Sequence, residues 1–254
     1  MLSAKPWRGE AVAAFCATQL ASLCLGLAVA GLLQKAGLPA FRDPDGFGLI
    51  LFSTLSFQGV TWLLIGLFLR SHQTSWREAF GFSQAQWWRV LLAALVVVLV
   101  ILPVAWSLQG LSAMALEKAG LTPEDQTAVK LLSAATTWWT QAYLCVFTVV
   151  IAPVAEEFIF RGVLFPFVKQ LGYPRLAWLG VSLLFALIHM DLAIVVPLFV
   201  LALALTWLYE LTDNLLAPIA AHSLFNTANP LVLYYSEPLD RFLQNFSQLI
   251  HERI

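Results

Sequence analysis

The sequence predicts an all-α fold, a polytopic membrane helical bundle with about seven or eight transmembrane helices. Composition provides two observations: 60% of the 254 residues are hydrophobic and only 11% are charged. The third observation is a series of apolar runs of about 20 residues, the helix length that crosses a bilayer. A soluble domain has about 25% charged residues. We therefore expect lipid, rather than water, to surround most of this chain.

The candidate spans follow one another along the whole chain. Their approximate ranges are residues 11–33, 47–69, 90–108, 134–168, 176–189, 193–211 and 215–235. The fourth passes through Pro153 and counts as two helices if the chain breaks there. The first follows Lys5 and Arg8 as a signal peptide would, but its apolar run is longer than usual and more spans follow. We expect it to be retained as a helix.

Three regions are predicted: N-terminal transmembrane helices with polar joints (1–133), a second helical core (134–235) and an amphipathic C-terminal tail (236–254). The joint at 71–88 mixes tryptophans with polar residues, which is typical of an interfacial segment. Thr122-Pro123-Glu124-Asp125 predicts a helix start. Apolar residues of the tail recur at helical spacing, so we expect it to lie on the membrane or to cap the bundle.

Basic residues predict the orientation of this integral, multi-pass protein. Loops that carry lysine and arginine stay in the cytoplasm. The side that holds the N-terminus has Lys5, Arg8, Arg70, Arg77, Arg89, Lys169 and Arg175, and the opposite side has Lys35, Arg42, Lys118 and Lys130. We expect the N-terminus to be cytoplasmic, by a small margin.

Charge and cysteine content exclude some classes of function. The net charge is −1, which gives no reason to expect a nucleic-acid partner. Cys16, Cys24 and Cys145 all lie in apolar runs. Their odd number and spacing predict neither a disulfide framework nor a cysteine metal site, and we interpret them as small apolar residues. The partner we expect from composition is the lipid bilayer.

Ionisable residues inside apolar runs are the main indication of function. Each costs about 2.5–3.5 kcal/mol to insert, so it needs a partner or a function. Glu156 and Glu157 are adjacent in one such run, and Arg161 lies four residues after Glu157. On a helix Glu157 and Arg161 can pair, while Glu156 points roughly 100° away. We predict a structural ion pair beside a free carboxylate, after a kink at Pro153.

Two further apolar runs carry polar side chains. His189 closes the run that contains Phe185, and Phe185 is expected to shape or shield a pocket. His222 and Asn226 are four residues apart and share a helix face. Each could simply form hydrogen bonds between helices. Asp191 is interpreted as a helix-end residue.

Together these groups predict a hydrolytic site within the membrane. A carboxylate, two imidazoles and an amide on separate spans can meet in one polar cavity. Glu156 is the predicted general base on a water molecule, and His189 is predicted to hold and polarise that water. His222 and Asn226 are predicted to donate hydrogen bonds to the oxyanion of a tetrahedral intermediate.

These motifs resemble those of the CPBP family of intramembrane proteases, which includes the type II CAAX prenyl endopeptidases and proteins linked to bacteriocin self-immunity. The family pattern stands here, in order, as Glu156-Glu157…Arg161, Phe185…His189 and His222…Asn226. The resemblance covers about residues 134–235. It implies an endopeptidase acting on lipidated (CAAX-type) or membrane-anchored proteins, with catalytic Glu156, His189, His222 and Asn226 and supporting Glu157, Arg161 and Phe185.

The family is often labelled a metalloprotease, and Glu156, His189 and His222 could bind zinc by residue type. The sequence has no closely spaced ligand pair such as His-x-x-x-His, so no metal is predicted with certainty. It also lacks His-Glu-x-x-His, Gly-x-Ser-x-Gly, Gly-x-Gly-Asp and a P-loop. Two other interpretations remain open at this point. One is a non-catalytic immunity or scaffold protein, and the other is a small proton-coupled transporter that uses the same residues as a relay.

Overall fold

The computed structural model describes residues 2–43, 46–82, 87–122, 127–228 and 231. The described chain is helical, and the predicted polytopic helical bundle is confirmed. Within it, five helices are long and apolar enough to cross a membrane. They are α1 (Gly9–Lys35), the continuous run of α2, η2 and α3 (Phe47–Ser71), α5 (Trp87–Lys118), the run from α7 to α9 (Trp138–Gln170) and α11 (Leu192–Thr212).

One of the predicted spans forms a shorter helix. Helix α10 (Pro174–Leu187) has 14 residues, fewer than the roughly 20 that a bilayer requires. The last predicted span is described as helix over residues 216–228 and again at 231. A proline in the first turn starts α10, and Met190, with φ of 54°, ends the run on its far side. The predicted seven or eight crossings therefore compare with five long helices, the shorter α10 and a last helix that is described only in part.

The third span is longer than predicted. Helix α5 reaches Lys118, about ten residues beyond the expected end near 108. The extension is rich in leucine, alanine, methionine, glutamate and lysine, which favour helix even where they are polar. Gly120, with φ of 76°, follows the helix end in the left-handed conformation that glycine adopts readily. Hydropathy alone located the apolar part of this helix and missed its polar continuation.

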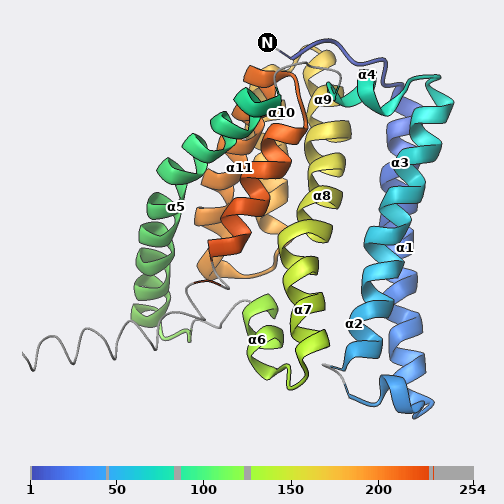
Figure 1. Cartoon of the computed structure of the whole chain (residues 1–254), viewed down its shortest axis with the longest axis vertical. Coiled ribbons are helices and arrows are strands. Elements are labelled where there is room, and N and C mark those ends of the chain that lie inside the picture. Colours follow the sequence, from blue (N-terminus) through green and yellow to red (C-terminus); the bar gives the residue numbers. More distant parts are fainter. Residues whose placement is uncertain (1, 44–45, 83–86, 123–126, 229–230, 232–254) are drawn as a thin grey trace, which may run out of the picture.

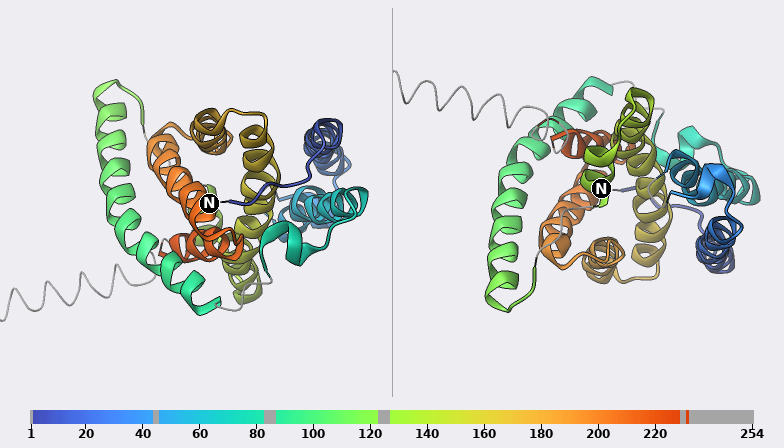
Figure 2. Two further views of the ribbon diagram at one scale, coloured as in Figure 1. Left: turned by 90° about the horizontal axis from the view of Figure 1, so that it is seen from above. Right: turned by 90° about the horizontal axis from the view of Figure 1, so that it is seen from below.

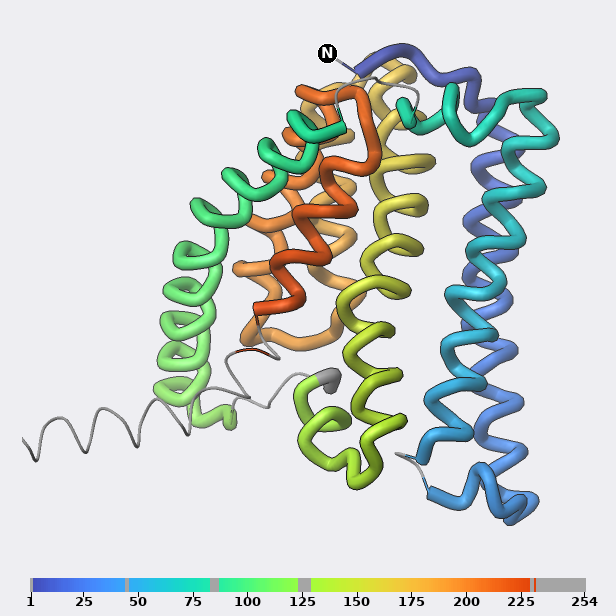
Figure 3. Tube along the Cα trace, viewed as in Figure 1, coloured from blue at the N-terminus to red at the C-terminus, as the bar shows by residue number. Residues whose placement is uncertain are grey.

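The helices form three groups (Figure 1). Helix α1 packs antiparallel against η2 and α3 as a hairpin at one side of the molecule, which the trace in Figure 3 follows. The long run from α7 to α9 stands beside it. Helix α11 packs between α10 and α5, and the view along the bundle shows α5 at the outer edge, opposite the hairpin (Figure 2). The last helix, 216–228, lies next to α11 and α5 through Ala217, Ala221 and Phe225.

The fourth span is one helix with two widened turns, and it does not break into two. Helices α7 (Trp138–Val146), α8 (Ala152–Glu157) and α9 (Phe165–Gln170) alternate with the π-helical segments η3 (Phe147–Ile151) and η4 (Phe158–Leu164). Pro153 lies inside this continuous helix directly after η3, and its missing N–H cannot bond a carbonyl of the preceding turn. Widened turns of this kind redirect side chains and recur at functional sites. Here they bracket the two glutamates.

The N-terminal segment closes one end of the bundle. Trp7 is buried, its ring packs edge-on against Phe68 of α3 at 4.9 Å, and its indole N–H donates to the Gly162 carbonyl at 2.9 Å. Lys5 forms an ion pair with Asp213 at 3.0 Å. These contacts tie the hairpin, η4 and the end of α11 together.

The predicted interfacial segment contains α4 (Trp76–Phe80). Ser75 and Glu78 form a reciprocal capping box at its start. Hydrogen bonds from the Ser75 backbone and then from its hydroxyl hold the pKa of Glu78 below its ordinary value. The proposed helix start at Thr122-Pro123-Glu124-Asp125 and the tail at 236–254 lie largely or wholly outside the described residues.

The Trp7 contact makes a testable contribution to stability. Trp7→Phe keeps a ring against Phe68 but leaves the buried Gly162 carbonyl without its donor. We expect a loss of about 1–3 kcal/mol, measurable in detergent as a thermal midpoint lower by several degrees. Trp106→Phe, at a tryptophan that is 41% exposed, is the matched control. An equal loss in both variants would contradict a specific role for the hydrogen bond.

Candidate active site

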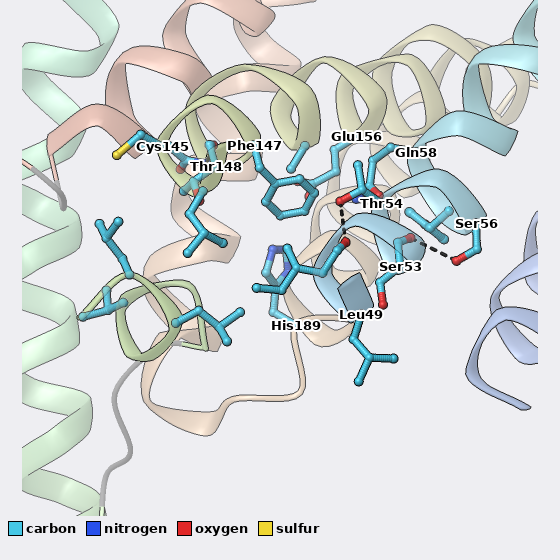
Figure 4. A pocket seen from close by; sticks show the side chains of 18 of the residues that line it. Leu49, Ser53, Thr54, Ser56, Gln58, Cys145, Phe147, Thr148, Glu156 and His189 are labelled. Atoms are coloured by element: carbon cyan, nitrogen blue, oxygen red, sulfur yellow. Dashed lines mark hydrogen bonds between the residues drawn. The ribbon is translucent and has the colours of Figure 1, made fainter. Parts of the chain in front are cut away.

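A cavity of about 620 Å³ lies between the α1–α3 hairpin and the helices of the second half. Glu156, His189, His222 and Asn226, the four residues predicted to be catalytic, all line it. Figure 4 shows Glu156, from α8, and His189, from the turn after α10, at this cavity. Much of its remaining wall is apolar, from Leu23 and Leu27 of α1 to Leu131 and Leu132 of α6 (Thr127–Ala134). The structure thus brings the predicted polar groups to one space.

The predicted ion pair between Glu157 and Arg161 is present and completely buried. Arg161 Nη1 donates to Glu157 Oε1 at 2.9 Å, and both side chains are 0% exposed. The other guanidinium nitrogens donate to the Ala202 carbonyl at 3.0 Å and the Thr206 hydroxyl at 3.3 Å. A buried charge pair is tolerated when hydrogen bonds satisfy its remaining atoms. This network fastens η4 to α11.

His222 links the ion pair to the free glutamate. Its Nδ1 lies 2.9 Å from Glu157 Oε1, and its Nε2 lies 3.8 Å from Glu156 Oε2. The Glu156 side chain is 20% exposed, while that of Glu157 is 0% exposed. The imidazole therefore stands between a buried carboxylate, which orients it, and a second carboxylate at the cavity wall. Although the two glutamates are adjacent in the sequence, Glu157 is fully buried and Glu156 lies at the cavity wall.

His189 follows the end of α10, and its ring is fixed by the backbone. Its Nδ1 lies 2.7 Å from the Phe185 carbonyl. A carbonyl only accepts hydrogen bonds, so Nδ1 carries the proton and Nε2 is left as an acceptor in the neutral ring. Phe185 is fully buried and is absent from the cavity wall. Its ring packs behind both histidines and under the Arg161 guanidinium, 4.7 Å from the ring centre, so it supports the site from behind and does not shield the pocket.

Asn226 is held by the widened turn before Glu156. Its Nδ2 donates to the Thr148 carbonyl of η3 at 3.0 Å. A π-helical turn leaves carbonyls without their usual helical donors, and Asn226 satisfies this one. The amide has a second N–H, which is free for another acceptor. Thr148 itself also lines the cavity.

The residues present do not form a metal site of the expected kind. In the described part of the chain, no group of three or more histidine, cysteine, aspartate or glutamate side chains could hold a metal ion. The three residues that could bind zinc by type are Glu156, His189 and His222. Nδ1 of His222 faces Glu157, and of the other two residues only Glu156 approaches its Nε2. We therefore derive no step through zinc.

Some cavity residues were not predicted. Ser53, Thr54 and Gln58 of the second span line the wall that belongs to the N-terminal half, for which the sequence indicated only a membrane helix. Their signal was polar residues inside an apolar run, which is weak for serine and threonine. Asp191 also lines the cavity, and its carboxylate accepts from Ala193 N–H at 2.9 Å as the N-cap of α11.

The fold and this cavity define an integral membrane protein that holds carboxylate and imidazole side chains together in a cavity inside its helical bundle. Residues 137–228 match the family model described as Type II CAAX prenyl endopeptidase Rce1-like. The match covers all three motifs and confirms the resemblance seen in the sequence. It leaves α1 to α6 outside. No curated protein and no solved structure matches the chain.

The buried ion pair gives a prediction for stability. Arg161→Met leaves the Glu157 carboxylate in the bundle core without its cationic partner, with the His222 imidazole as its remaining contact. Breaking one side of such a pair costs about 3–5 kcal/mol, so we expect a large drop in the unfolding midpoint in detergent. Arg175→Met, at the exposed start of α10, is the control and is expected to unfold as the wild type does. Unchanged stability of Arg161→Met would contradict the structural role of the pair.

Proposed function

We propose that this protein is an intramembrane endopeptidase that cleaves membrane-anchored or lipidated, CAAX-type protein substrates with a water molecule activated by Glu156. The observation that carries the proposal is the convergence of Glu156, His189, His222 and Asn226 on one cavity within the bundle. The Rce1-like match over the same residues supports a protease. A mostly apolar wall suits a substrate that reaches the site from lipid.

Glu156 is the proposed general base. It accepts a proton from the attacking water as the oxygen of that water bonds to the scissile carbonyl carbon. Nε2 of His189, an acceptor in the neutral ring, takes the second hydrogen of the same water in a hydrogen bond and so orients it. Collapse of the tetrahedral intermediate breaks the C–N bond, and Glu156 returns its proton to the leaving amine.

The oxyanion needs donors on the other side of the carbonyl. Asn226 offers its second amide N–H there, since the first is bonded to Thr148. His222 donates through Nε2 when that nitrogen is protonated, and Glu156, at 3.8 Å, is placed to exchange this proton. Removing one such donor costs about 10²–10³-fold in kcat.

Glu156→Gln tests the proposal. The amide keeps the size of the side chain but cannot accept the proton, so we expect cleavage to fall by at least about 10²-fold. The assay uses purified protein in detergent with prenylated and membrane-anchored peptides, and compares the membrane proteomes of cells that make either form. Glu117→Gln, at the exposed far end of α5, is the control and keeps full activity. Unchanged cleavage by Glu156→Gln would remove Glu156 from the chemistry.

We also propose that the N-terminus is cytoplasmic. Helix polarity in Figure 1 puts the N-terminus, the end of α3, the start of α5 and the turn between α9 and α10 at one end of the bundle. That end has more basic residues than the other, which supports its retention in the cytoplasm.

Thiol labelling tests this orientation. The three native cysteines are replaced by alanine, and a single cysteine is placed at Leu171 or at Leu38, which are 56% and 44% exposed at opposite ends of the bundle. A membrane-impermeant reagent is expected to label Leu38→Cys in intact spheroplasts and Leu171→Cys only in inverted vesicles. The reverse pattern would overturn the orientation without affecting the proposed chemistry.

A further inference from the structure

We infer that Gln58, in the second span, is a substrate-positioning residue that binds the main chain of the peptide lying across the cavity. This inference rests on the proposed function. Gln58 lines the cavity from η2 (Leu55–Gly59), and the Rce1-like match begins only at residue 137. It enters the cavity from the helix that faces the one carrying Glu156 (Figure 4).

Most of the other polar side chains that line the cavity from the second span are bonded within their own helix. The Thr54 hydroxyl donates to the Ile50 carbonyl at 2.9 Å, and the Ser56 hydroxyl donates to the Ser53 carbonyl at 3.0 Å. Gln58 differs, because its amide makes no hydrogen bond to any residue that the structure describes. An amide without a partner in a membrane span is costly. It is therefore available for a ligand.

The backbone around Gln58 is held in place by buried groups. Segment η2 is a π-helical turn, and its Phe57 carbonyl accepts from the backbone N–H of Val60. Two side chains bond that carbonyl: Gln19 of α1 donates at 3.3 Å, and Thr61 of α3 donates at 2.9 Å. Gln19 and Thr61 are 7% and 1% exposed. The widened turn is thus a supported feature of the hairpin, and it fixes the position from which Gln58 projects.

The chemistry of an amide fits an extended peptide. A glutamine side chain has a carbonyl acceptor and an NH₂ donor, so it can pair with both the N–H and the C=O of a peptide main chain. Such a contact aligns the chain whatever its side chains are. Glu156, His189, His222 and Asn226 act on the scissile bond from the second half of the protein. Gln58 supplies an opposing contact from the first half, which defines how the peptide lies between them.

The test separates binding from chemistry by working in the Glu156→Gln background. The probe is a fluorescent S-farnesylated peptide of CAAX type, and its Kd is measured by fluorescence anisotropy in detergent. Gln58→Leu keeps the size of the side chain and removes its hydrogen bonds. We expect a Kd about 3- to 10-fold higher, as for the loss of one hydrogen bond. With Glu156 intact, the same variant is expected to raise KM by this factor and to leave kcat nearly unchanged.

Gln109→Leu is the matched control, because it makes the same substitution in α5 at a residue that does not line the cavity. A second series replaces single peptide bonds of the probe by esters, which removes one N–H at a time. At the position that Gln58 binds, the ester weakens binding to the parent and not to Gln58→Leu. A structural role alone would not produce this dependence.

Three outcomes overturn the inference: wild-type Kd and KM in Gln58→Leu, equal losses in Gln109→Leu, or no binding of the probe to the parent. Cleavage that survives Glu156→Gln would instead refute the proposed function, whatever Gln58 does. The two failures are therefore distinguishable.

Discussion

The buried pair of Glu157 and Arg161 is the interaction on which the site depends. Two opposite charges 2.9 Å apart are stable inside a membrane bundle only if neighbouring groups satisfy their remaining hydrogen bonds. Arg161 consequently bonds to α11, Phe185 packs against the guanidinium, and His222 turns Nδ1 toward Glu157. That last contact leaves Nε2 facing Glu156. The geometry of the cavity wall thus follows from an ion pair that does not itself line the cavity.

The π-helical segments η2, η3 and η4 provide further contacts between helices. The Thr148 carbonyl of η3 accepts from Asn226, the Phe57 carbonyl of η2 accepts from Gln19 and Thr61, and the Gly162 carbonyl of η4 accepts from Trp7. In a bilayer each such carbonyl requires a donor from the protein. A side chain therefore connects each π-helical segment to a neighbouring segment of the protein.

Hydropathy and helix spacing predicted much of this structure and failed for identifiable reasons. Apolar runs located the five long helices, and the four-residue spacing of Glu157 and Arg161 gave their pairing. The polar end of α5 escaped because helix propensity, not hydropathy, determines it. Phe185 was expected to shape or shield the pocket, and it packs against both histidines and the Arg161 guanidinium without lining the cavity. Gln58 was missed because the sequence does not show which face of the α1–α3 hairpin lines the cavity that also contains Glu156.

The aromatic packing around Trp7 limits the side from which the cavity can be reached. Trp7, Phe68, Phe80 and Phe158 fill the bundle at the end nearest the N-terminus. The residues that line the cavity come from the middle and the opposite half of their helices, such as Ala30 of α1 and Leu49 of α2 (Phe47–Thr54). None of these four aromatic residues lines the cavity, so they separate it from that end of the bundle. Under the proposed function, a peptide and its cleavage products would enter and leave the cavity on a side away from this aromatic cluster.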